Sequence, residues 1–428
     1  MKILVIGSGG REHAIVWAMQ NTSSTTPLKI FCAPGNAGIA QTAQVVPISV
    51  SAQSDLVRFA QSEEIDLTFV GPEAPLAAGI VDLFEAHGLP IVGPSRSAAR
   101  LEASKIFAKD FMIRHAIPTA SYRVADSAGE ALEILRSTQL GDDQVVIKAD
   151  GLAAGKGVVV ARSLVEAEKA IEDLMINHVA GEEAGQRVII EEALEGREAS
   201  LLVFTDGRDY ALMPPARDHK RVGEGDTGPN TGGMGSITDS SVLDDSTLKD
   251  IVRDIVEPTL TGAHRDGFAF KGILFLGLML TADGPKLLEY NVRFGDPETQ
   301  AILVRLQTDL LSVFEAIRKG TLGGLRVDWS VGSSACVVAA NRGYPGRFET
   351  GAVIEGLNEV EQGAVHIFHA GTTSADDGKL LATGGRVLGV TAAAENLPEA
   401  LSLCYRSLER IHWWGMQFRH DIGRSSGN

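Results

Sequence analysis

The chain has 428 residues, of which 44% are hydrophobic, and its formal net charge is −16. This length suits about three domains with large cores, the apolar fraction excludes a disordered chain, and the negative charge argues against general nucleic-acid binding. The sequence has no run of roughly 18 apolar residues, no signal-peptide pattern at its start and only scattered cysteines, so we expect a cytoplasmic protein without membrane spans.

Short apolar runs alternate with helical patterns in the first 95 residues. The runs are Ile3–Ile6, Ile30–Ala33, Leu67–Val70 and Ile91–Val92, and each ends in a glycine or proline turn. Near-continuous apolar strands separated by helices are typical of a parallel sheet covered on both faces. We therefore expect a doubly wound parallel sheet whose ligands bind where its strands end.

The turn after the first run is rich in glycine. It resembles a dinucleotide fingerprint, but Glu12 stands where the third glycine belongs. We expect an anion site at a helix N-terminus, in which Gly9, Gly10 and Arg11 face a phosphate. A tight turn without a ligand is the alternative.

A second glycine-rich loop, residues 151–157, joins two expected strands, Val145–Lys148 and Val158–Ala161. Its glycine spacing differs from that of a Walker A motif, and a strand follows it instead of a helix. Glycines still let the backbone approach a ligand, and Lys148 and Lys156 add positive charge. The loop therefore predicts a lid over a triphosphate, with a plain hairpin as the alternative.

The middle of the chain reads as α+β. Its expected helices span residues 98–116, 163–177, 245–265 and 298–318, and its expected strands span residues 187–191, 198–205, 210–213, 273–280 and 286–293. Residues 191–198 connect two strands and indicate either a hinge beside an adenine or a charged surface turn. Residues 216–236 have no apolar period, so we expect a long functional or flexible loop there.

Polar residues alternate along the last of these strands. Strand periodicity places Glu289, Asn291 and Arg293 on one face, and Leu288, Tyr290 and Val292 on the other. Carboxylate and amide oxygens suit Mg²⁺, and a guanidinium suits a phosphoryl oxygen. A solvated strand face is the alternative. Asp296 is either a helix cap or a substrate contact.

Residues 330–392 are predicted to be strand-rich and to be closed by a helix near residues 398–411. Taken together, these motifs resemble the ATP-grasp superfamily and, within it, the phosphoribosylamine–glycine ligases (glycinamide ribonucleotide synthetases) of purine biosynthesis. The unbroken runs Gly228–Gly235 and Arg293–Gln300 carry the resemblance most specifically. Ser8 and Tyr290 are small departures from the family pattern.

The resemblance covers essentially the whole chain and implies an α/β and α+β multidomain fold. The implied parts are an N-terminal doubly wound domain (1–103), a central ATP-grasp domain (104–325) with a lid-like subdomain at about 120–190, and a small strand-rich C-terminal domain (326–428).

The resemblance also implies an activity. ATP, with Mg²⁺ or Mn²⁺, would drive the ligation of glycine to 5-phosphoribosylamine through glycyl phosphate, giving glycinamide ribonucleotide, ADP and phosphate. Such a reaction needs positioning and charge neutralisation more than a protein nucleophile. Another ATP-grasp carboxylate–amine ligase and a non-catalytic nucleotide-binding regulator are the alternatives. The partners are these small molecules, with neither nucleic acid nor membrane. We expect a monomer or weak dimer, and transient hand-over of phosphoribosylamine by the enzyme that makes it stays open.

The same resemblance assigns roles to individual residues. Those expected to face glycine and the transferring phosphoryl group are Arg293, Asp296 and Asp218. Those expected to hold ATP are Lys105, Lys148, Gly155, Lys156, Gly157, Glu191, Glu192, Ala193, Leu194, Glu198, Lys220 and Asn230. Those expected to line the phosphoribosylamine site are Gly9, Gly10, Arg11, Glu73 and Pro75. Those expected to bind the metal ion are Glu289 and Asn291.

Overall fold

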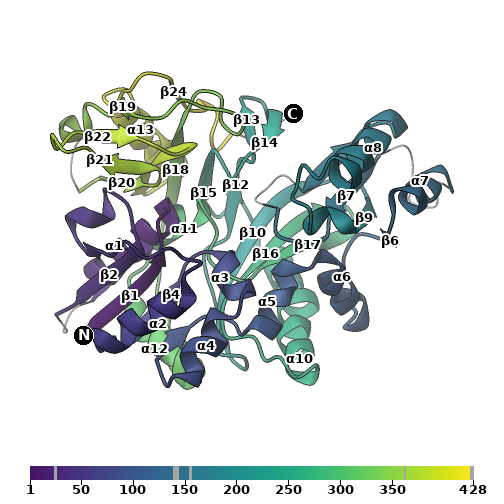
Figure 1. Ribbon diagram of the computed structural model, residues 1–428, viewed down its shortest axis with the longest axis horizontal. Coiled ribbons are helices and arrows are strands. Elements are labelled where there is room, and N and C mark those ends of the chain that lie inside the picture. Colours follow the sequence, from purple (N-terminus) through teal and green to yellow (C-terminus); the bar gives the residue numbers. More distant parts are fainter. Residues whose placement is uncertain (24–26, 138–143, 154–156, 361–362, 425–428) are drawn as a thin grey trace.

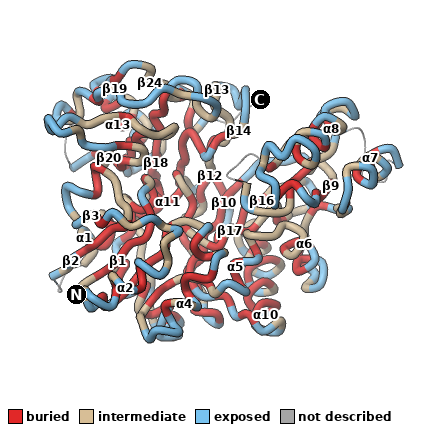
Figure 2. Tube along the Cα trace, viewed as in Figure 1, coloured by how far each residue is buried: buried red, intermediate tan, exposed pale blue. Residues whose placement is uncertain are grey.

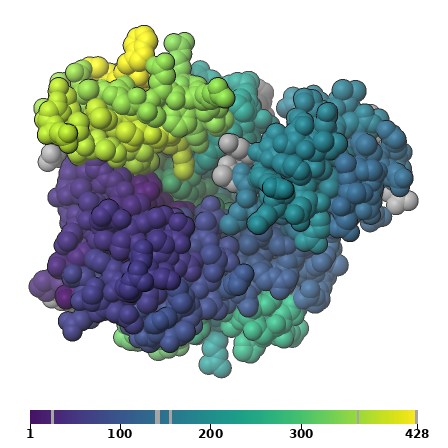
Figure 3. Space-filling model, viewed as in Figure 1, coloured from purple at the N-terminus to yellow at the C-terminus, as the bar shows by residue number. Residues whose placement is uncertain are grey.

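The computed structural model describes residues 1–23, 27–137, 144–153, 157–360 and 363–424. Figure 1 shows a broad body and, at one side, a smaller lobe that contains α7 and α8. The space-filling view shows a hollow between the lobe and the body (Figure 3). None of the described helices is long and apolar enough to cross a membrane.

The N-terminal region forms a five-stranded parallel sheet in the order β3-β2-β1-β4-β5. The strands are β1 (Lys2–Gly7), β2 (Lys29–Pro34), β3 (Gln44–Val45), β4 (Leu67–Val70) and β5 (Ile91–Val92). The connecting helices are α1 (Gly10–Thr22), α2 (Gln53–Ser62), α3 (Glu73–Ala77) and α4 (Ile80–Ala86). The parallel pairing of these strands confirms the predicted parallel sheet, and the apolar residues of β1 are fully buried in it.

The lobe is built on a four-stranded antiparallel sheet in the order β6-β9-β7-β8. Its elements are β6 (Tyr122–Ala125), α7 (Ala128–Ser137), β7 (Val145–Ala149), β8 (Val158–Ala161), α8 (Leu164–Ile171), a π-helical turn (Glu172–Ile176) and β9 (Val188–Glu192). Its buried residues form a cluster of their own, which extends from Ala125 to Ile190. The lobe therefore packs around a core separate from that of the body.

A ten-stranded sheet runs through the body, with the main order β17-β16-β10-β12-β15-β18-β23-β20. Its strands are β10 (Arg197–Thr205), β11 (Tyr210–Leu212), β12 (Ala216–Asp218), β15 (Gly235–Thr238), β16 (Gly272–Thr281), β17 (Gly284–Asn291), β18 (Ser333–Asn341), β20 (Val365–His369), β23 (Arg386–Ala394) and β24 (Met416–Gln417). Antiparallel pairing of β15 with β18 carries this sheet from the middle of the chain into the C-terminal region. Figure 2 shows that the buried trace follows these strands, with exposed segments around the rim.

Helices and short strands complete the body. The helices are α5 (Arg96–Ala103), α6 (Lys105–Arg114), α9 (Asp245–Ile251), α10 (Glu257–Arg265), α11 (Glu298–Leu303), α12 (Leu310–Lys319) and α13 (Leu397–Leu408). The short strands are β13 (Arg221–Gly223), which pairs with β14 (Thr227–Asn230), and β19 (Ala352–Val353), β21 (Thr372–Ser374) and β22 (Leu380–Ala382).

Two predicted helices are each divided in the structure. The helix expected over residues 98–116 breaks at Ser104, which has an extended backbone and caps α6 by accepting the Phe107 N–H. The helix expected over residues 298–318 stops at Leu303 and restarts after Asp309, which caps α12. Both breaks arise because a serine or aspartate side chain competes for backbone N–H groups.

The loop expected over residues 216–236 is also different in the structure, because it contains β12, β13, β14 and the start of β15. These short strands pair through backbone groups and need no apolar alternation. A β-bulge changes the alternation along β17, where Glu289 pairs with Gly277 but Leu287 pairs with Leu278. Leu287 is therefore buried and Leu288 faces the same cleft as Glu289, contrary to the expectation from simple alternation.

Candidate active site

A cleft of about 1440 Å³ opens where the lobe, the large sheet and the N-terminal domain meet. The predicted site residues that line it are Arg11, Glu73, Lys105, Lys148, Gly157, Glu191, Glu192, Ala193, Leu194, Glu198, Asp218, Lys220, Asn230, Glu289, Asn291, Arg293 and Asp296. Apolar side chains of the lobe and of β16 and β17 line it as well: Val158, Val160, Met279 and Leu288. The cleft thus combines charged groups with an apolar wall suited to a flat base.

A few predicted site residues lie elsewhere. Pro75 lines a separate cavity of about 410 Å³. Gly9 is close to the cleft, since a Cβ built on it would lie 3.3 Å from Asp296 Oδ2. Gly10 contacts α11, because a Cβ on it would meet Gln300. Gly155 and Lys156 lie outside the described residues.

A buried ionic triad lies at the junction of the lobe and the body. Glu191 Oε2 is 2.9 Å from Lys148 Nζ and 3.3 Å from Lys109 Nζ. All three side chains are almost inaccessible, and burial lowers the pKa of Lys109 to about 8. Oε1 of Glu191 is buried without a hydrogen-bond partner. An orphan acceptor beside an apolar wall fits the exocyclic amino group of an adenine.

Arg293 is held by two acidic side chains from the N-terminal part of the chain. Its Nε donates to Glu73 Oε2 at 3.1 Å, and its Nη2 lies 2.9 Å from Glu102 Oε1. Glu102 also accepts the Val292 N–H at 2.7 Å. Burial raises the pKa of Glu102 to about 7, although Arg293 opposes that shift. Burial also acts to raise the pKa of Glu73, but Arg293 and Arg11 outweigh it and hold that pKa below its usual value. The guanidinium is therefore fixed in direction before any ligand arrives.

Glu289 and Asn291 supply oxygen ligands at the end of β17. Burial favours the neutral form of Glu289, but neighbouring cations, chiefly Lys220 and Lys148, outweigh it and hold the pKa below its ordinary value. The Asn291 amide oxygen accepts from Arg293 at 3.1 Å. An ionised carboxylate and an amide oxygen on one wall fit Mg²⁺, which usually fills its remaining positions with phosphate oxygens and water. Within the described ranges, no group of three or more His, Cys, Asp and Glu side chains forms a ready metal cage.

Acidic side chains near β12, a strand of the same sheet as β17, form an acidic wall of the cleft. Burial raises the pKa of Asp218 to about 7 and also raises that of Glu298, and each carboxyl disfavours ionisation of its acidic neighbours. Lys220 Nζ lies 2.7 Å from Glu198 Oε2. Because this wall carries more acids than the lysine neutralises, it favours a ligand with an ammonium group.

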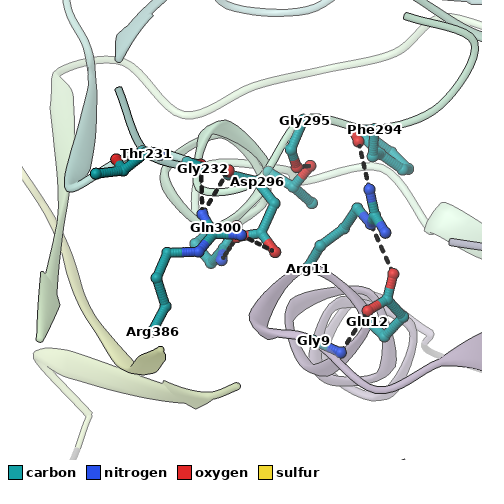
Figure 4. Close-up of polar contacts among 12 residues, drawn as sticks. Gly9, Arg11, Glu12, Thr231, Gly232, Phe294, Gly295, Asp296, Gln300 and Arg386 are labelled. Atoms are coloured by element: carbon teal, nitrogen blue, oxygen red, sulfur yellow. Dashed lines mark hydrogen bonds and ion pairs between the residues drawn. The ribbon is translucent and has the colours of Figure 1, made fainter. Parts of the chain in front are cut away.

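Two arginines, one from α1 in the N-terminal region and one from β23 in the C-terminal region, form hydrogen bonds with the turn that carries Asp296 (Figure 4). Arg11 Nη1 donates to the Phe294 carbonyl at 3.1 Å. Arg386 Nη1 donates to the Gly232 and Asp296 carbonyls at 2.6 and 2.7 Å, and its Nη2 lies 3.1 Å from Asp296 Oδ2. Arg386 thereby links Asp296 both to the glycine-rich residues 228–235 and to the C-terminal region.

Glu12 explains why the first turn departs from a dinucleotide fingerprint. Its carboxylate accepts the Gly9 N–H at 2.6 Å and the Arg11 Nε–H at 2.6 Å. An internal carboxylate thus occupies the start of α1, where a ligand anion was expected. A Cβ on Gly71 would lie 2.0 Å from Glu12 Oε1, so a glycine is required beside it.

Sequence reasoning missed several residues of the cleft: Glu102, Lys109, Glu298 and Arg386. Some had signals, because Lys109 follows Lys105 by one helical turn, Glu298 ends the polar run that starts at Arg293, and Arg386 follows two glycines. Glu102 had none, since its partner Arg293 lies far away in the sequence.

Three models of one family match most of the chain. The model described as phosphoribosylglycinamide synthetase, N domain, matches residues 1–102; the ATP-grasp (A) domain model matches residues 103–299; and the C domain model matches residues 334–425.

Curated relatives and solved structures agree with this match. The phosphoribosylamine–glycine ligase of Caldanaerobacter subterraneus subsp. tengcongensis is 48% identical over 422 residues, covering 99% of each chain, and that of Vibrio cholerae is 47% identical over 427 residues, covering 99% of this chain and 98% of that one. The crystal structure of phosphoribosylamine–glycine ligase from Thermotoga maritima superposes with a TM-score of 0.84 at 34% identity, over 98% of this chain and all of that one. The biotin carboxylase domain of Hydrogenobacter thermophilus 2-oxoglutarate carboxylase, solved with MgADP, shares the fold at 16% identity with a TM-score of 0.73, over 97% of this chain and 91% of that one.

Proposed function

We propose that this chain, which belongs to the phosphoribosylglycinamide synthetase family, ligates glycine to 5-phosphoribosylamine with ATP. The products are glycinamide ribonucleotide, ADP and phosphate. One observation carries the proposal: Glu289, Asn291 and Arg293 face one cleft together with Lys105 and Lys148. These groups suit a nucleoside triphosphate and its metal ion.

ATP binds with its base at the hinge, residues 191–194, where the buried Glu191 Oε1 accepts from the exocyclic amino group. Lys105 and Lys148 attract the phosphates, and Glu198 holds the ribose. Glu289 and Asn291 hold Mg²⁺ or Mn²⁺, which neutralises charge on the phosphates when it is bound. Without a cation between them, Glu289 and a phosphate about 4 Å apart would repel by about 4 kcal/mol at an effective dielectric of about 20.

Glycine binds at the acidic wall, with its ammonium group at Asp218 and its carboxylate toward Arg293. A carboxylate oxygen of glycine attacks the γ-phosphorus, the bond to the bridging oxygen breaks, and ADP leaves. The ribosylamine nitrogen then attacks the acyl carbon of glycyl phosphate, phosphate leaves, and the nitrogen loses a proton. Asp296, which lines the cleft and pairs with Arg386, is the residue to which we assign the uptake of this proton.

Phosphoribosylamine binds on the N-terminal side, where Arg11 and Glu73 line the cleft. Arg11 is directed into place by Glu12. In this structure the Gly9 N–H donates to Glu12 and Gly10 lies against Gln300, so Arg11 and Glu73 carry this part of the proposal.

An ADP-release assay tests the function. The chain is mixed with ATP, Mg²⁺, glycine and freshly prepared phosphoribosylamine, and ADP and phosphate are followed with each substrate omitted in turn. We expect release to require both glycine and the amine. Release with another amino acid but not with glycine would assign a different carboxylate–amine ligase, and nucleotide binding without any turnover would refute ligase activity.

A further inference from the structure

The C-terminal tail, residues 419–424, lies against the hairpin formed by β13 and β14. The tail is far in sequence from both strands and contacts them through hydrogen bonds from Arg419 and to Asp421. The hairpin follows directly on Asp218, His219 and Lys220, and Asn230 ends it. Asp218, Lys220 and Asn230 line the cleft, so the tail contacts the segment that presents them.

Arg419 is the centre of this contact. Its side chain is only 2% exposed, and its Nη1 donates to the Arg221 carbonyl at 3.0 Å and to Asp226 Oδ1 at 2.7 Å. Nε and Nη2 donate to the two Asp421 oxygens, each at 2.7 Å. Asp226 has a left-handed backbone, with φ of 54°, at the tip of the hairpin. The guanidinium therefore fixes a turn that an aspartate adopts only with local support.

The rest of the tail binds the same segment through its backbone and side chains. The Gly225 N–H donates to Asp421 Oδ2 at 2.8 Å, and the His420 N–H donates to Glu224 Oε1 at 3.2 Å. The Gly423 N–H donates to His219 Nε2 at 2.9 Å. Because this makes Nε2 the acceptor, the His219 ring carries its proton on Nδ1, which lies 4.0 Å from Asp226 Oδ1.

The tail is itself anchored to the body. The Tyr405 hydroxyl on α13 donates to the Arg419 carbonyl at 3.1 Å and accepts the Ile422 N–H at 3.1 Å. Ile422 is buried and lies against β15, where a Cβ on Gly235 would be 2.8 Å from it. A rigid tail can therefore set the position of the hairpin, because one side of the tail is fixed to a helix and a strand.

We propose that Arg419 and the C-terminal tail are positioning elements of the active site, which hold Asp218 and Lys220 in the geometry that binds glycine. This inference rests on the proposed function, because it assigns the acidic wall to glycine. Arg419 does not line the cleft and acts through Asp226, Arg221 and His219. A buried arginine is costly unless its donors are used, and four hydrogen bonds run from Arg419 to acceptors of the hairpin and the tail.

Steady-state kinetics of the full chain test the proposal. The variants are Arg419→Ala, Arg419→Lys and Asp226→Asn, and the control is Arg406→Ala, an exposed α13 arginine that donates only weakly to the Ser402 carbonyl, at 3.4 Å. Partial misfolding lowers the active fraction and hence kcat, whereas mispositioning of the acidic wall raises the KM for glycine. We expect Arg419→Ala to lower kcat/KM for glycine on the order of a hundredfold, largely through KM.

Rescue gives a second readout. Arg419→Lys should keep an intermediate KM, and free guanidinium, below the concentration that destabilises the wild type, should lower the KM of Arg419→Ala. An unchanged KM for glycine in folded Arg419→Ala would overturn the proposal. If that variant does not fold, Asp226→Asn decides, because its side chain is 36% exposed; a wild-type KM there would overturn the proposal too.

Hydrogen exchange separates this inference from the proposed function. Amides of residues 219–230 should exchange faster in Arg419→Ala than in Arg406→Ala, whatever the enzyme's substrate. A wild-type chain that released no ADP with glycine would refute the proposed function, while faster exchange would still support the role of the tail. Equal exchange in both variants would refute that role.

Discussion

Replacing Glu191 by glutamine removes the carboxylate that neutralises two buried lysines. Its Oε2 lies 2.9 Å from Lys148 Nζ and 3.3 Å from Lys109 Nζ. At an effective dielectric of about 20, each pair attracts by about 5 kcal/mol, but desolvation and repulsion between the lysines offset much of this. Removing one partner of a buried pair costs about 3–5 kcal/mol, which is the loss of unfolding free energy that we expect.

The loss should depend on pH in a defined direction. The pKa of Lys109 is about 8 in the folded chain and 10.5 in the unfolded chain, and without Glu191 its folded value falls further. At a pH between the folded and the unfolded pKa of Lys109, this lysine is protonated in the unfolded chain and neutral in the folded chain. The unfolding free energy of the variant therefore rises with pH in this window. Glu191→Gln should therefore be most destabilised below pH 7 and should recover at alkaline pH.

Urea denaturation followed by circular dichroism measures the effect. The matched control is Glu192→Gln, because Glu192 is the next residue on β9 and its partly exposed carboxylate lies 3.6 Å from Lys286 Nζ. The control should lose less than about 1 kcal/mol. Equal losses in the two variants, or a loss in Glu191→Gln that does not change between acid and alkaline pH, would refute the electrostatic reasoning.

Other predictions concern the metal ligand Glu289, the turn that Arg386 holds at Asp296, and the unfolding free energy at acid pH. Glu289→Gln should raise the Mg²⁺ concentration for half-maximal ADP release by tenfold or more, on the order of the losses seen when metal-site groups are changed; an unchanged Mg²⁺ titration would contradict the metal role. Arg386→Met should lower kcat/KM about tenfold or more because Asp296 loses its fixed position; wild-type kinetics would show that the Arg386 contact is dispensable. Burial lowers the pKa of His13 to about 3 and that of His369 to about 4, both from 6.5. Below pH 6.5, therefore, these two histidines bind protons in the unfolded chain but stay neutral in the folded chain. The unfolding free energy should then drop by up to about 1.4 kcal/mol per pH unit for each histidine, and His13→Asn should flatten this slope in urea titrations from pH 6.5 to pH 5; an identical slope in the variant would contradict it.

The sequence predicts the elements whose pattern is local. The buried runs of the N-terminal sheet, the antiparallel pair β16 and β17, and the closing helix α13 follow from apolar patterns and from the turn residues between them. Residues 98–116 kept a helical pattern across Ser104, and periodicity cannot show that this serine caps a new helix. The bulge at Leu288 also depends on the register with β16, which is a property of two strands and not of one.

The candidate site shows the same division. Charged residues beside glycines, such as those near Lys148 and Arg293, can be recognised because their neighbours in sequence are unusual. Glu102 cannot, since it looks like an ordinary charged surface residue until the fold buries it against a distant partner, Arg293. Long-range ion pairs carry no period and no motif, so single-sequence reasoning has no signal for them.

The separate core of the lobe has a consequence for how the molecule moves. Of the thirteen buried residues in this cluster, seven are alanines. An alanine side chain buries far less apolar surface than leucine or isoleucine, so the lobe holds itself together with little hydrophobic free energy. Among the described parts of the chain, the lobe should therefore be the first to open under heat, denaturant or protease. A lobe with so small an apolar core can open at low cost in free energy, as the proposed reaction requires when ADP leaves the cleft.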